Sequence, residues 1–197
     1  MRFNLNILFF SLVALSLSCH RDSNPVSPLE PESGGIIPLR TGNQWIYLIT
    51  SYDTIGRPRG AFIDTNRITK DTLIGSAYWF NLNGGLYVTN KSDGVWYYDQ
   101  GNTYKMLPSA LNDSVIYSST DSIYIKLVSQ TAPVLTPAGR FTAYKYELVF
   151  ANHLQFVPNV YYYVPNIGLV ESDAYSKTES GFQYKGADAQ LLYWIVQ

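Results

Sequence analysis

The run Phe141-Thr142-Ala143-Tyr144-Lys145-Tyr146-Glu147-Leu148-Val149-Phe150 is the stretch that decides the fold. Its apolar side is formed by Tyr144, Tyr146, Leu148 and Phe150, and Lys145 and Glu147 lie on the opposite side. A second run, residues 122–129, has Ile123, Ile125 and Leu127 on one side and Ser122, Tyr124 and Lys126 on the other. A period of two with one apolar side is typical of an antiparallel sheet that packs one face on a core.

Shorter runs of strand-forming residues, each bounded by turn residues, extend over the rest of the chain. They cover residues 44–49, 61–69, 73–81, 86–89, 95–98, 104–107, 114–118, 160–164, 168–176 and 190–196, with a loop at 55–60 and a hairpin turn at Asp93-Gly94. With the two runs above they make about eleven or twelve strands. A flat sheet of that size would expose its edges and one apolar face. We therefore expect an all-β fold with little helix, an antiparallel meander curled into a barrel, half-barrel or sandwich.

Composition excludes several classes of function. The 197 residues carry a net charge of −1 and contain no basic block, which argues against nucleic-acid binding. One Cys and two His cannot form an internal disulfide or a cysteine-rich zinc site. Charged residues make up 15% of the chain and aromatic residues another 15%, with 17 Tyr. A neutral, tyrosine-rich globular protein is what remains.

The N-terminus predicts export. Residues 1–18 have one positive charge, Arg2, before an apolar run that ends in small residues, as in a secretory signal peptide. The single cysteine, Cys19, follows directly, and this arrangement resembles the lipobox of bacterial lipoproteins, in which that cysteine is acylated. The chain departs from the usual lipobox in having Ser16 where leucine is common. The alternative is an ordinary signal peptide followed by a free thiol.

The resemblance implies a protein anchored to a bacterial envelope membrane through lipidated Cys19, and we expect the outer membrane. Residues 19–35 are rich in Pro, Ser and Gly and form a flexible tether. Residues 36–197 are aromatic and β-branched throughout and predict a single β-rich domain.

Few residues of the domain point to catalysis. His153 is its only histidine and lies in a predicted loop, without a Gly-x-Ser-x-Gly motif or a domain cysteine. The acidic stretches around Asp113 and Asp121 do not match a calcium-binding loop. We therefore expect no enzyme activity, no catalytic residue, no metal ligand and no cofactor. Carboxylates that a glycosidase could use, but that more simply solubilise the surface, are Asp64, Asp71, Glu147, Glu171 and Asp173.

The aromatic residues are the remaining candidates for binding, because Trp and Tyr suit both sugar stacking and the lining of apolar pockets. The residues that we expect to contact a ligand are Trp45, Trp79, Trp96, Tyr98 and Tyr162. Core packing is the simpler alternative, since aromatic residues are good strand formers. In Tyr161-Tyr162-Tyr163 neighbouring rings must point to opposite faces, so they cannot all lie in one core.

Three stretches together resemble a group of uncharacterised secreted bacterial lipoproteins. Residues 38–47 resemble their "PL-x-x-G-N-x-W-x-Y" opening, residues 137–141 their "P-A-G-x-F" turn, and residues 162–170 their "Y-Y-x-P-x-I-G-L-V" segment. The resemblance implies a β-rich domain like the curved half-barrels of periplasmic lipoprotein carriers, and it implies no catalytic residues.

The leading hypothesis is a membrane-anchored, non-enzymatic envelope lipoprotein whose β domain binds an apolar ligand or an envelope partner. The second is a structural or protein-interaction module with a packed core and an exposed aromatic patch. The third is a glycan-acting hydrolase. The interior discriminates between the first two, because a lipid carrier needs an apolar cavity and a docking module has a filled core with outward Trp and Tyr.

Overall fold

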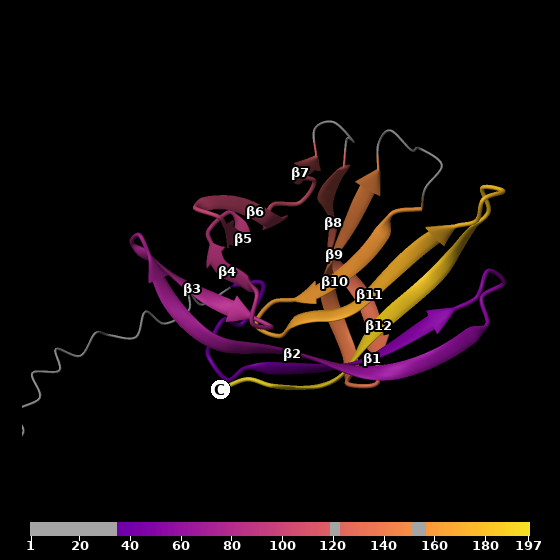
Figure 1. Ribbon diagram of the computed structural model, residues 1–197, viewed down its shortest axis with the longest axis horizontal. Helices are drawn as coiled ribbons and strands as arrows, with labels where there is room; N and C mark the ends of the chain where they lie inside the picture. Colours follow the sequence, from indigo (N-terminus) through magenta and orange to yellow (C-terminus); the bar gives the residue numbers. More distant parts are fainter. Residues whose placement is uncertain (1–34, 119–122, 151–156) are drawn as a thin grey trace, which may run out of the picture.

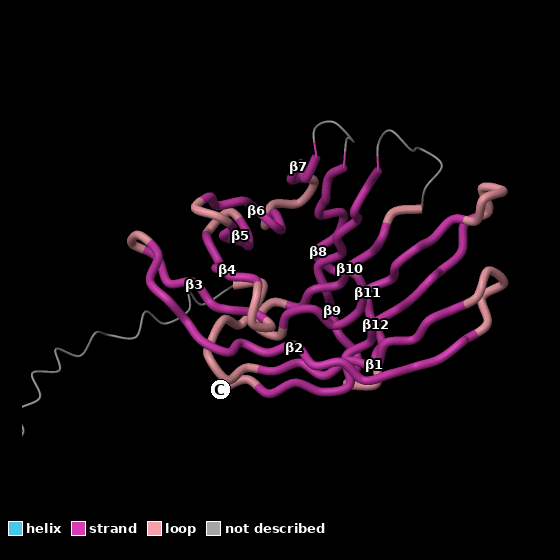
Figure 2. Tube along the Cα trace, in the orientation of Figure 1, coloured by secondary structure: helices cyan, strands magenta, loops and turns pink. Residues whose placement is uncertain are grey.

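The computed structural model describes residues 35–118, 123–150 and 157–197, which form one antiparallel sheet of 12 strands (Figure 1). The strands are β1 (Gln44–Tyr52), β2 (Pro58–Ile74), β3 (Ala77–Leu82), β4 (Leu86–Lys91), β5 (Gly94–Asp99), β6 (Asn102–Pro108), β7 (Ser114–Ser118), β8 (Ile123–Thr136), β9 (Gly139–Phe150), β10 (Asn159–Val164), β11 (Gly168–Lys177) and β12 (Gln183–Ile195). The all-β prediction is confirmed, and within these ranges every regular element is a strand (Figure 2). The described residues include no helix long and apolar enough to cross a membrane.

The sheet is a meander that curls until its two ends approach each other. Its strand order is β6-β5-β4-β3-β2-β1-β12-β11-β10-β9-β8-β7. Strands adjacent in sequence therefore pair with each other, except β6 and β7, and β12 pairs with β1. The opening of the curled sheet lies between β6 and β7. Strand β2 is long enough to join both halves, because it pairs with β1 up to Arg67 and with β3 from Ile68 onward.

The core lies on the inner side of the curl and contains the alternate residues that the sequence predicts. Ile125, Leu127 and Tyr146 are buried there, and Lys145 lies on the opposite face with its Nζ 2.8 Å from Glu147 Oε1. The other core residues are Ile36, Ile37, Leu39, Trp45, Tyr47, Ile68, Val88, Val95, Leu107, Val134, Ala143, Tyr163, Val170 and Leu191.

The segment that precedes β1 is part of this core. Ile36, Ile37 and Leu39 are at most 6% exposed. The segment is held from two sides, because Asn90 Nδ2 donates to the Ile37 carbonyl at 2.7 Å and the Asn166 N–H donates to the Gly35 carbonyl at 3.2 Å. The segment before β1 therefore forms part of the core that the sheet encloses.

Side-chain and turn hydrogen bonds bridge the opening between the two ends of the sheet. The Tyr146 hydroxyl donates to the Pro108 carbonyl at 2.9 Å, and Gln130 Nε2 donates to the Ser109 carbonyl at 3.2 Å. The Asn112 N–H donates to the Leu127 carbonyl at 2.9 Å. These bonds link the end of β6 and the turn after it to β8 and β9, where no strand ladder closes the sheet.

Several strand boundaries differ from the predictions: β2 begins at Pro58, within the predicted loop 55–60, and β12 begins at Gln183, before the predicted start at residue 190. The predicted strand 73–81 is wrong, because β2 ends at Ile74, the chain turns at Gly75 with φ 63°, and β3 begins at Ala77. Strand β8 continues to Thr136, beyond the predicted end at Ser129, although it contains Pro133. Proline is tolerated there because β7 pairs with β8 only up to Lys126, which leaves the missing N–H on an unpaired side.

The predicted hairpin is present between β4 and β5, but its turn is Ser92-Asp93, one residue earlier than predicted, because Gly94 already pairs with Lys91. Gly94 has φ 141°, and a Cβ at this position would lie 1.9 Å from the Leu107 carbonyl oxygen of β6. Only glycine allows the two backbones to approach this closely. The turn therefore fixes both the β4–β5 register and the position of β6.

Candidate functional site

Three of the five aromatic residues that the sequence singles out lie together on one face of the sheet. Val88 and Val95 belong to the core, so their neighbours in β4 and β5 point away from it. Trp96 pairs with Thr89 and Tyr98 pairs with Tyr87. We call this surface the outer aromatic patch and define it as Trp79, Tyr87, Trp96 and Tyr98 with Lys70, Lys91 and Lys105.

Trp79 lies at the bottom of the patch although it points away from the core. Its ring centroid is 5.7 Å from that of Tyr98, with the planes tilted by 54°, and Lys91 Nζ lies 5.8 Å from it. These neighbours leave Trp79 only 2% exposed. The outer face of the sheet thus carries a small aromatic layer of its own, beneath an exposed lysine.

Trp96 is half-buried and lies against two cations. Lys91 Nζ is 4.0 Å from the Trp96 ring centroid, and Lys105 Nζ is 5.7 Å from it. Cations at these distances are attracted by the negative face of the indole. Lys70 lies in the same way 5.9 Å from the ring of Tyr87, so each lysine of the patch is associated with an aromatic ring.

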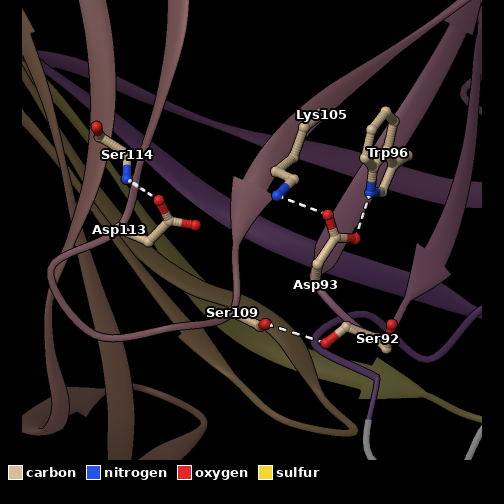
Figure 3. Close-up of polar contacts among 7 residues, drawn as sticks. All are labelled: Ser92, Asp93, Trp96, Lys105, Ser109, Asp113 and Ser114. Carbon is tan, nitrogen blue, oxygen red and sulfur yellow. Dashed lines mark hydrogen bonds and ion pairs between the residues drawn. The ribbon is translucent and has the colours of Figure 1, made fainter.

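Asp93 holds Trp96 and Lys105 in place (Figure 3). The Trp96 indole N–H donates to Asp93 Oδ1 at 2.8 Å, and Lys105 Nζ lies 2.6 Å from Asp93 Oδ2. The hydrogen bond from Lys105 is the largest cause that lowers the pKa of Asp93, and the bond from Trp96 acts in the same direction. The turn itself is braced by the Ser109 hydroxyl, which donates to the Ser92 carbonyl at 3.2 Å.

The charge of the patch is positive. It brings together three lysines, and the one carboxylate beside them, Asp93, forms an ion pair with Lys105 alone. An arrangement of fixed rings and cations on an open sheet face can bind an anionic or flat partner, but it contains no nucleophile and base in contact.

The other two predicted residues lie elsewhere. Trp45 is 3% exposed in the core, where its indole N–H donates to the Ile167 carbonyl, so it is separate from the patch. Tyr162 lies on β10 between Lys145 of β9 and Glu171 of β11. Burial is the main cause that raises the pKa of Tyr162.

Charged residues next to Tyr162 form a network on β11 and β12. Lys185 Nζ lies 2.5 Å from Asp173 Oδ1 and 3.1 Å from Asp188 Oδ2. The Tyr52 hydroxyl donates to Asp188 Oδ2 at 2.7 Å. Burial lowers the pKa of Lys185, but its bonds to the two carboxylates outweigh this and raise the pKa overall.

The carboxylates considered for a glycosidase are distributed over several environments. Glu147 pairs with Lys145 and Asp173 with Lys185. Asp71 accepts a hydrogen bond from the Thr41 hydroxyl at 3.0 Å. Burial, followed by the charge of Asp173, raises the pKa of Glu171. Cys19, Asp121 and His153 lie outside the described residues, and within the described ranges no three His, Cys, Asp or Glu side chains are grouped so that they could hold a metal ion.

Lys91, Asp93 and Lys105 belong to the site without being among the residues that the sequence predicts for it. The signal for Lys91 was available, because a hairpin centred on Asp93-Gly94 places the last residues of β4 beside the first residues of β5. Lys105 comes from β6. The pairing of β5 with β6 shifts register between Val95 and Trp96 of β5, and such a bulge has no clear signal in this sequence.

No protein-family model matches the chain, and no curated protein matches it. Among solved structures, the chain is similar to a candidate lipoprotein from Parabacteroides distasonis ATCC 8503, with 16% identity and a TM-score of 0.45 over 83% of this chain and 100% of that one. It is also similar to a candidate exported protein with a YmcC-like fold from Bacteroides fragilis NCTC 9343, with 16% identity and a TM-score of 0.40 over 82% of this chain and 99% of that one. At this identity and these TM-scores, the likenesses define neither the family nor the function of the chain.

Proposed function

We propose that the protein is a non-enzymatic lipoprotein of the bacterial envelope that docks an envelope component through the outer aromatic patch. The observation that carries the docking part is the position of Trp96, which is held by Asp93 and covered by Lys91 on the face away from the core. Aromatic residues fixed on an exposed face, rather than packed inside, are typical of contact surfaces.

The N-terminal sequence supports the anchor. Residues 1–18 have the charge and apolarity of a signal peptide, and Cys19 follows them in the position of a lipidated cysteine. At about 3 Å per residue, the tether 19–35 lets the domain reach about 50 Å from the bilayer. The patch therefore has access to components that lie well above the membrane surface.

The interior favours docking over lipid carriage. The inner side of the sheet holds the aromatic rings of Trp45, Tyr47, Tyr146 and Tyr163 together with the segment that contains Ile36 and Ile37. A carrier needs that space for its ligand. The packed-core alternative that the sequence left open is therefore the one we adopt.

Photo-crosslinking in cells tests the docking role. Benzoylphenylalanine in place of Tyr87 puts a photoreactive ring at the patch, and the same substitution at Ile116 of β7 is a control at an exposed apolar position outside it. We expect Tyr87 adducts that disappear when Trp96→Ala is added, and no adducts at Ile116. Irradiation that yields no patch-specific adduct would overturn the proposal.

A further inference from the structure

We infer that the component docked by the patch is an acidic polysaccharide, whose carboxylates pair with Lys91 and accept the indole N–H of Trp79. This inference rests on the proposed function and specifies its ligand. Two groups in the patch lack the partners that such a ligand would supply, and their neighbours suit sugar rings.

The first group is the ammonium of Lys91. Among the described residues it forms no ion pair with a carboxylate, whereas Lys105 and Lys145 each have one and Lys185 has two. Its contacts are the rings of Trp79 and Trp96, which attract a cation but do not neutralise it. Lys91 is exposed, so it can swing away from the rings to meet an anion without disturbing the strands.

The second group is the indole N–H of Trp79. Trp79 is 2% exposed, and its Nε1 has no hydrogen-bond acceptor among the described residues. Buried donors are satisfied in nearly all native structures, and an exception needs an explanation. In contrast, the indole N–H groups of Trp45 and Trp96 both find acceptors. Lys91 Nζ lies 5.8 Å from the Trp79 ring centroid, so a ligand that displaces Lys91 comes close to the ring that carries this unpaired donor.

The surroundings favour a sugar chain over an acidic peptide. Tyr87, Trp96 and Tyr98 are half-buried on adjacent paired strands, which gives flat apolar surfaces at the strand spacing of about 4.8 Å. Sugar rings stack on such surfaces through their C–H faces. Peptides more often add to a sheet edge or enter a groove, whereas the patch is the broad face of β2 to β6.

Affinity electrophoresis of the mature lipoprotein in detergent tests the inference. Polygalacturonate embedded in the native gel serves as the acidic polysaccharide, dextran as the neutral one and polyglutamate as the acidic peptide. We expect retardation by polygalacturonate only, weakened by salt because the pairing is ionic. Retardation by dextran to the same extent would overturn the role of charge, and equal retardation by polyglutamate would overturn the assignment to sugar.

Two substitutions locate the contact. Trp79→Phe retains a ring but removes the N–H, and we expect the dissociation constant for polygalacturonate to rise about tenfold, as for a lost hydrogen bond to a charged group. Lys91→Ala should raise the dissociation constant at least as much, whereas Lys91→Arg, which retains the charge, should bind like the wild-type protein. Lys126→Ala of β8 is the control outside the patch. Unchanged affinity in both Trp79→Phe and Lys91→Ala would overturn the inference.

The two proposals fail in distinguishable ways. A patch-specific adduct with a protein, together with no polygalacturonate binding, would leave docking standing and overturn the acidic polysaccharide. The absence of any patch adduct would overturn both.

Discussion

The indole N–H of Trp96 donates to Asp93 Oδ1 at 2.8 Å, across the turn that joins β4 to β5. The second oxygen of the same carboxylate pairs with Lys105 of β6 at 2.6 Å. One acidic side chain thus fixes the most exposed tryptophan of the outer aromatic patch and links three strands. Because Trp96 and Lys105 come from separate strands, this carboxylate fixes their positions relative to each other.

Replacing this carboxylate with an amide should weaken the turn in a pH-dependent way. Asp93→Asn removes the charge that Lys105 pairs with but retains an oxygen for Trp96. The pKa of Asp93 is lowered from 3.8 in the folded protein. The stability that its charge contributes is therefore present above 3.8 and disappears as the pH falls through the folded-state pKa. Since Asp93 is 49% exposed, we expect a loss of only about 0.5 kcal/mol at neutral pH.

Thermal unfolding of both proteins at about pH 7 and about pH 2 measures this difference. The two melting temperatures should differ at neutral pH and converge in acid. An equal difference at both values would show that the carboxylate charge contributes nothing.

Lys185 should stabilise the β11–β12 region more than a surface lysine does. Lys185→Met leaves Asp173 and Asp188 close together without their cation, and Asp188 is 6% exposed. Breaking a buried pair costs about 3–5 kcal/mol, and we expect about 1–2 kcal/mol here because Lys185 is about one-third exposed. Lys126→Met, at a lysine without an ion pair among the described residues, is the control.

The wild-type protein should show the same interaction at alkaline pH. The bonds of Lys185 to Asp173 and Asp188 raise its pKa from 10.5. The stabilisation by this pairing is therefore complete below pH 10.5 and disappears as the pH rises through the folded-state pKa. Urea unfolding across that range should therefore show a loss of stability that Lys185→Met lacks. Parallel curves for the two proteins would contradict this.

Tyr146 should hold the opening of the sheet closed. Its hydroxyl donates to the Pro108 carbonyl at the end of β6, and its ring packs against that of Tyr163 in the core. Tyr146→Phe retains the ring and leaves the carbonyl without this donor, which we expect to cost about 1–2 kcal/mol. Tyr104→Phe, at a residue 44% exposed, is the control.

Hydrogen exchange adds a local measurement for Tyr146→Phe. The amides of β6 should exchange faster in this variant, because the hydroxyl links that strand to β9. Uniformly faster exchange over the whole sheet, with β6 affected no more than β11, would show that the hydroxyl has no special role at the opening.

The sequence predicted strands best where polar and apolar residues alternate. In β9, Lys145 and Glu147 interrupt the apolar residues, and this pattern correctly assigned Tyr146 to the core. Trp45 and Trp79 lie in continuous apolar runs, which have no such alternation. Which of them faces the core depends on cross-strand register and on the curl of the sheet, and neither is encoded in a single strand.

The candidate site was predictable only in part for the same reason. Trp79, Trp96 and Tyr98 were chosen for residue type, and pairing on β3 to β5 brings them to one face. Lys105 joins them through β6, after a register shift at Trp96. An irregularity of one residue changes which side chains become neighbours. Which lysines lie in the patch can therefore be known only from the observed strand pairing.

Removing the thiol of Cys19 should release the protein from membranes. One acyl chain gives only marginal membrane binding, whereas two or more give stable anchoring, so a lipidated Cys19 would hold the protein in the membrane fraction. Cys19→Ala should move it to the soluble fraction, and Ser23→Ala in the tether should not.

Palmitate labelling provides a second measurement, because an uncleaved signal peptide could itself retain the variant. The wild-type protein should incorporate label and Cys19→Ala should not, since the chain has no other cysteine. An unlabelled wild-type protein, or a variant that is labelled equally, would refute lipidation at Cys19.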